Sequence, residues 1–67
     1  MNHVKFATIK KIAKSKGLVF DYDEEDDVYF VTDRHGMLLM EYAPITIMLI
    51  KNADVWRHEF NVLRTQM

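Results

Sequence analysis

The 67-residue chain contains no cysteine, only two glycines and one proline, and a single serine, Ser15. The missing cysteines exclude disulfide bonds and zinc sites built from thiolates. With glycine only at positions 17 and 36, the chain cannot form a glycine-rich phosphate-binding loop. A domain of this size also has little room to hold a catalytic group, its positioning partner and a substrate pocket together. We therefore expect a non-enzymatic protein with no catalytic residues and no cofactor.

Long hydrophobic runs are also missing. The longest uncharged stretch, residues 42–50, contains Pro44 and polar side chains, and falls well short of the roughly 20 apolar residues that span a bilayer. The first five residues, Met-Asn-His-Val-Lys, do not follow the pattern of a signal peptide. These patterns predict no membrane partner and a cytoplasmic location.

Two groups of residues share single features with metal sites without completing one. The acidic run 21–27 starts like an EF-hand loop, but Asp26 stands where that loop needs glycine and Thr32 where it needs glutamate. The three histidines, at positions 3, 35 and 58, lack the spacing of a ligand pair on a helix. We expect no metal site and interpret the acidic run as a solvated hairpin turn.

The chain contains enough hydrophobic side chains to form one core. Hydrophobic residues make up 49% of the sequence, which predicts a single small folded domain over residues 1–67. A domain of this length buries only about 60% of the surface of its unfolded chain, so its stability is marginal without further support. Since disulfides are excluded, packing and association have to supply that support.

Charge is distributed unevenly along the sequence. Residues 1–17 carry five lysines and no acid, whereas residues 18–44 carry eight acids and only Arg34 as a base. The remaining residues are nearly balanced, so a net charge of −1 conceals a strongly polarised molecule.

The hydrophobic spacing predicts an α+β fold. Residues 3–16 show helical spacing of apolar side chains opposite the lysines, and Gly17 stands where a left-handed residue ends a helix. Strands are predicted at 18–22, 27–32 and 37–42, because β-branched and aromatic residues are separated there by short polar turns. Such short connections favour a three-stranded antiparallel meander.

The C-terminal part is predicted to be helical, as one long helix or two short ones. Pro44 suits a first helical position, and Asn52 could cap a second helix. One apolar stripe continues at helical spacing to the end of the chain; its members are Ile45, Leu49, Ala53, Trp56, Phe60 and Leu63. A strand over residues 45–50 remains the alternative, because this segment is rich in β-branched residues.

Two of the predicted strands are apolar on both faces. Residues 28–31 and 37–40 contain consecutive apolar side chains, and successive side chains of a strand point to opposite faces. Both faces of the sheet therefore need cover. The helical segments could cover one face each, and otherwise a second subunit is needed.

From these features we expect a small protein-protein interaction module that self-associates, most simply as a homodimer, and binds or inhibits another macromolecule. The candidate contact residues are Trp56, Phe60 and Leu63 on the C-terminal stripe, together with the adaptable side chain of Met40. The sequence does not identify the protein partner.

Nucleic-acid binding through the first helix is the alternative function. Lys10, Lys11 and Lys14 could neutralise several phosphates. No aromatic side chain is interleaved with them to stack on bases, and the acidic middle of the chain repels a polyanion. A solvated helix face that complements its own dipole is the favoured interpretation of these lysines.

Overall fold

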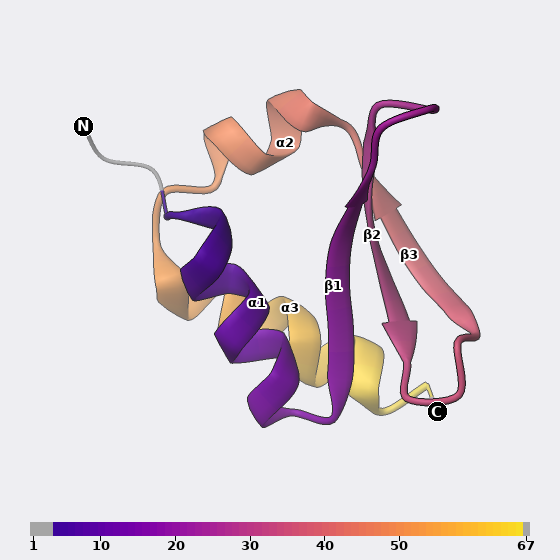
Figure 1. Ribbon diagram of the computed structural model, residues 1–67. Helices are drawn as coiled ribbons and strands as arrows, with labels where there is room; N and C mark the ends of the chain where they lie inside the picture. The colour runs from indigo at the N-terminus through magenta and orange to yellow at the C-terminus, as the bar shows by residue number, and fades with distance from the viewer. Residues whose placement is uncertain (1–3, 67) are drawn as a thin grey trace.

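The computed structural model describes residues 4–66, which form three helices and a three-stranded sheet (Figure 1). The elements in chain order are α1 (Phe6–Ser15), β1 (Leu18–Asp23), β2 (Val28–Asp33), β3 (Leu38–Tyr42), α2 (Pro44–Leu49) and α3 (Ala53–Arg64). The predicted α+β class and order of elements are confirmed. None of the helices in the described residues is long and apolar enough to cross a membrane.

Helix α1 begins at Phe6, later than predicted, with Lys5 in the N-cap position. Its buried residues are Ile9, Ile12 and Ala13, which share one face because they lie three or four positions apart. The helix ends before Gly17, whose φ of +76° is the left-handed conformation expected there. The chain can then turn directly into β1.

The three strands form an antiparallel meander in the order β1-β2-β3. Phe20 pairs with Val31, and Val31 in turn pairs with Met40, so these three lie on the same face of the sheet. A bulge interrupts the β2–β3 register between Val31 and Thr32, which brings Leu39 onto the core side as well.

Residues 24–27 of the acidic run form the hairpin turn between β1 and β2, as interpreted from the sequence, whereas Asp21 and Asp23 lie at the end of β1. The Asp23 carboxylate accepts a hydrogen bond of 3.0 Å from the backbone N–H of Glu25. Asp27 adopts a left-handed φ of +53°, which aspartate tolerates better than most residues, and its carboxylate accepts a hydrogen bond from the Tyr22 hydroxyl. Residues 24–27 are exposed, and the carboxylates of Asp23 and Asp27 stabilise the turn.

The C-terminal part is two helices, which decides between the alternatives left open by the sequence. Pro44 occupies the first turn of α2, and residues 50–52 lead into α3 in extended conformation at both Ile50 and Asn52. The Asn52 side chain caps α3, because its Oδ1 accepts a hydrogen bond of 2.8 Å from the N–H of Asp54.

The expected continuous stripe is wrong in its first half. Ile45 is 58% exposed and Leu49 is 67% exposed, whereas Ile47 is the buried residue of α2. The extended residues between the helices break the helical period, so α2 turns a different set of side chains inward than the continued stripe would.

Every helix contributes to a core on one face of the sheet (Figure 1). Phe20, Trp56 and Phe60 are its largest members, with the Trp56 ring 5.7 Å from Phe20 and 5.4 Å from Phe60. The core also takes in these buried side chains: Ile9, Ile12, Ala13, Leu18, Val31, Tyr42, Ile47 and Leu63. Successive side chains of a strand point to opposite faces, so the strand residues that alternate with these core residues face away from all three helices.

Candidate interaction surfaces

Three of the four residues expected to contact a partner are core residues. Trp56 and Phe60 are 0% exposed, and Leu63 is 4% exposed. A partner could reach them only by displacing α3, which holds the apolar layer over the sheet. This burial corrects the expectation that they form a contact surface, and we do not place them in an interface.

Met40, the fourth candidate, remains accessible. It is 41% exposed on β3, which is an edge strand of the sheet. Its pairing with Val31 places it on the same face as the core, at the border of the helical layer. The structure therefore separates Met40 from the other three candidates instead of joining them in one patch.

Two polar groups belong to core residues, one at the border of the core and one inside it. The Tyr42 hydroxyl donates a hydrogen bond of 2.7 Å to Glu59, and burial together with this carboxylate raises the pKa of Tyr42 far above its usual value. The indole N–H of Trp56 is buried without a hydrogen-bond partner. The rings of Tyr42 and Trp56 pack against each other and Trp56 packs against Phe60, so both polar groups are parts of core residues.

The first accessible surface is the face of the sheet that no helix covers. Its side chains follow from the pairing of the strands, since Thr32 lies between Val19 and Leu38, and Phe30 lies between Asp21 and Glu41. Val19 is 46% exposed and Leu38 is 53% exposed. We call this surface the open face and define it by Val19, Val28, Phe30, Thr32 and Leu38, with Asp21 and Glu41 at its rim.

Sequence reasoning noticed that both faces of these strands are apolar but did not select the open-face residues. The alternation of side chains along the strands gives the two sets, because Val19 and Phe30 are the sequence neighbours of Phe20 and Val31 and so point to the opposite face. Selecting them required knowing that all the helices pack on one side, which is a property of the tertiary structure.

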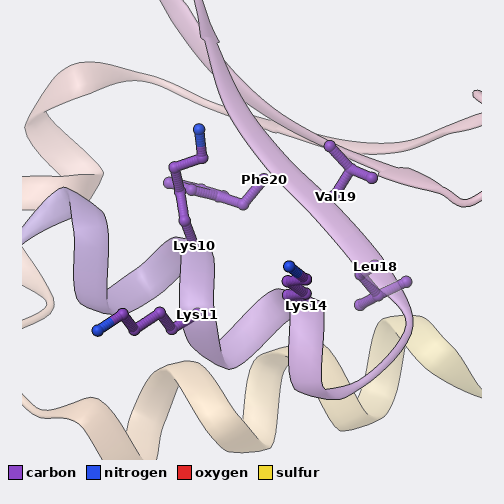
Figure 2. Close-up of a pocket in the computed structure, with 6 residues that line it drawn as sticks. All are labelled: Lys10, Lys11, Lys14, Leu18, Val19 and Phe20. Atoms are coloured by element: carbon purple, nitrogen blue, oxygen red, sulfur yellow. The ribbon is translucent and has the colours of Figure 1, made fainter.

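The second accessible surface is a groove of about 290 Å³ between α1 and the edge strand β1. Its walls carry Lys10, Lys11 and Lys14, and Leu18, Val19 and Phe20 line the strand side. In Figure 2, Lys10 and Lys14 stand beside the strand, whereas Lys11 points away from it. The structure thus brings the three predicted nucleic-acid candidates to one groove, which we call the lysine groove.

One lysine of the groove is already paired. The Lys10 ammonium lies 4.0 Å from the Asp21 carboxylate and 5.3 Å from the centre of the Phe6 ring. Both contacts hold the ammonium near the edge of β1. The ion pair is half exposed, so its contribution to stability is small, about 0–1 kcal/mol.

A second hollow, of about 440 Å³, lies between the turn after α1 and the turn after β2, lined by Lys16, Gly17, Asp33, Arg34 and His35. The Asp33 carboxylate accepts hydrogen bonds from the backbone N–H groups of Met37 and His35, and the bond from Met37 is the main cause that lowers the pKa of Asp33. This carboxylate therefore organises the β2–β3 turn and is not free for a ligand.

Metal ligands are not gathered in the part of the chain that the structure describes. Residues 4–66 contain no group of three or more histidine or acidic side chains arranged to hold an ion. His35 lies in an exposed turn and His58 on the exposed side of α3, while His3 lies outside the described residues.

Comparison with known proteins adds no functional information to this geometry. Neither protein-family models, nor curated proteins, nor solved structures yield a match to the chain.

Proposed function

We propose that the chain is a non-enzymatic protein-protein interaction module that self-associates as a dimer through the open face of its sheet. The observation that carries the proposal is that all three helices pack on one face, while the other presents Val19 and Leu38 to solvent and holds the half-buried Phe30 on its central strand. A sheet needs apolar cover on each apolar face. The cytoplasmic location expected from the sequence is retained as part of the proposal.

A second copy fits the open face because an isologous contact uses the same patch twice. Two such sheets can pack face to face about 10 Å apart, with Phe30 on the central strand facing the partner's sheet. The edges of the sheet offer a second copy a poorer contact, because β3 carries a bulge and the edge of β1 lies beside the lysines of α1, which repel the same lysines of another copy.

The acidic rim makes this association sensitive to salt in an unusual direction. Asp21 and Glu41 flank Phe30 on the two edge strands, so two apposed faces bring like charges together. Salt screens this repulsion and also strengthens the burial of apolar surface when the anion is sulfate. We expect the dimer to become tighter as sodium sulfate is added.

The test is sedimentation equilibrium of the chain and of Phe30→Lys. A buried lysine pair at the centre of the interface should weaken the dimer at least about thirtyfold, the effect of losing a strong contact residue. Val62→Lys is the matched control, because Val62 is 44% exposed on α3, away from the open face. A wild-type chain that remains an 8 kDa monomer at millimolar concentration would refute the proposal.

Nucleic-acid binding remains the second candidate, and the observation in its favour is that three lysines share one groove. Phe20, the only aromatic residue of that groove, is 1% exposed and cannot stack on a base. We therefore expect little binding at physiological salt. Submicromolar affinity for an oligonucleotide at that salt, lost on replacing Lys10, Lys11 and Lys14 by glutamine, would reverse the order of the two candidates.

A further inference from the structure

The lysine groove runs along the unpaired edge of β1. The sheet order leaves one side of this strand without a neighbour. The Tyr22 N–H donates a hydrogen bond of 2.9 Å to the carboxylate of Asp21, so it points away from β2. Because backbone groups alternate along an antiparallel strand, the N–H and C=O of Phe20 also point to the unpaired side, and those of Val19 point to β2.

A carboxylate already occupies part of this edge. The same Asp21 oxygen that accepts from the Tyr22 N–H lies 4.0 Å from the Lys10 ammonium. It stands where an acceptor of an added strand would stand, since a neighbouring strand bonds to outward N–H groups. A carboxylate at this edge can therefore accept a hydrogen bond from a backbone N–H of β1 and lie close to a lysine of α1 at the same time.

The spacing of the lysines matches an extended chain. Lys10 and Lys14 are one helical turn apart on α1, about 5–6 Å between their Cβ atoms. Every second side chain of a β-strand lies on the same face, and two such residues are about 6.4–6.8 Å apart along the strand. Two acidic residues separated by one residue would therefore face the two lysines together, while the residue between them would extend the row of Val19 on the open face.

We propose that the groove binds an acidic, extended peptide of another protein, which adds to β1 as a fourth strand. Its alternate carboxylates pair with Lys10 and Lys14, and its backbone pairs with the outward groups of Phe20. Charge complementarity selects this partner, because residues 1–17 carry five lysines and no acid. The groove shares Val19 and Asp21 with the open face, but binding of the peptide does not rest on the proposed dimer.

The binding test uses the full chain and three probes at low and physiological salt. The probes are a blocked peptide of alternating glutamate and valine, the same peptide with lysine for glutamate, and single-stranded oligothymidylate. We expect only the glutamate peptide to bind at physiological salt, with affinity that falls as salt rises. Tight binding of the oligothymidylate instead, or of the lysine peptide, would overturn the assignment.

Variants separate the groove from general attraction by positive charge. Lys10→Gln with Lys14→Gln should weaken peptide binding about tenfold, as two lost surface ion pairs imply. Lys51→Gln with Arg64→Gln removes the same charge outside the groove and should change the affinity much less. Equal losses in the two double variants would show that the lysine groove is not the site.

Backbone amide exchange separates strand addition from binding by side chains alone. The glutamate peptide should slow exchange of the Phe20 amide and leave the Val19 amide, already paired with β2, unchanged. Peptide binding without protection of Phe20 would overturn strand addition. Protection of Phe20 before peptide is added, rising with protein concentration, would assign the edge to a second copy and also overturn it.

The same titration on Phe30→Lys distinguishes this proposal from the proposed dimer. Peptide binding should persist in that variant, because Phe30 lies outside the groove. Loss of peptide binding with loss of the dimer would show that the edge site depends on the open face, contrary to the proposal.

Discussion

Replacing Trp56 tests whether this residue is the central core side chain. Trp56 is 0% exposed, and its ring lies 5.7 Å from Phe20, 5.3 Å from Tyr42 and 5.4 Å from Phe60. Truncation of such a residue to alanine costs about 3–5 kcal/mol, as transfer and cavity effects combine. A chain of this length has a total stability of about 3–10 kcal/mol. Trp56→Ala should therefore lose a third or more of its stability.

Trp56→Phe is a second substitution, which tests the indole N–H separately from the bulk of the ring. This group is buried without a partner, a state that costs about 1–3 kcal/mol. Trp56→Phe removes the unpaired N–H while keeping most of the ring, so we expect a loss of only about 1–2 kcal/mol. Val62→Ala, at an exposed position of the same helix, should change stability by less than about 0.5 kcal/mol.

Urea unfolding followed by far-ultraviolet circular dichroism measures all three variants. Protein concentration must be held constant, because dimerisation contributes to apparent stability. If Trp56→Ala stays within about 1 kcal/mol of the wild type and loses only its association, then Trp56 faces a partner and the core described here is refuted. If Trp56→Phe is as damaging as Trp56→Ala, then the indole N–H has a partner in solution.

Two further predictions concern the ends of elements. Asn52→Ala should lower the unfolding free energy by about 1 kcal/mol in urea titrations, because the cap on the Asp54 N–H is lost, whereas Asn61→Ala inside α3 should not destabilise the chain. The pKa of Asp33 is lowered in the folded chain, first of all by the hydrogen bond from the Met37 N–H. Its ionised form therefore stabilises the fold fully above the unfolded pKa of about 3.9. This stabilisation is lost as the pH falls through the lower pKa of the folded chain. Asp33→Asn should be less stable at pH 7 and should show a smaller loss on acidification; an unchanged acid profile would contradict this role.

Local features of the fold were readable from the sequence because they depend on neighbouring residues. Gly17 was expected to end the first helix in a left-handed conformation, and its φ is +76°. The short polar turns predicted a meander, and the strands pair in that order. Asn52 was recognised as a possible cap, and its side chain accepts the Asp54 N–H. Each of these rests on backbone geometry within a few residues.

The placement of candidate site residues could not be read in the same way. Ile45 and Leu49 fit the helical stripe of Trp56 in sequence, but the extended link before α3 changes the direction of α2 and leaves both exposed. The three lysines of α1 were known, yet their groove forms only because β1 folds back along the helix. Phe30 is apolar in sequence, and only the packing of all the helices on the other side of the sheet places it on the uncovered face.

The sequence by itself therefore determined the first helix, the three strands and the two apolar faces of the sheet, and it left residues 45–50 open between helix and strand. Only the tertiary structure decided that α1 and α3 pack together on the same face, with Phe20 and Trp56 between the layers. The physical reason is that periodicity identifies the apolar side of each element, whereas the choice of neighbour depends on how side chains from distant segments fill one common volume. That choice left Phe30 on the uncovered face, where we propose that a second copy binds.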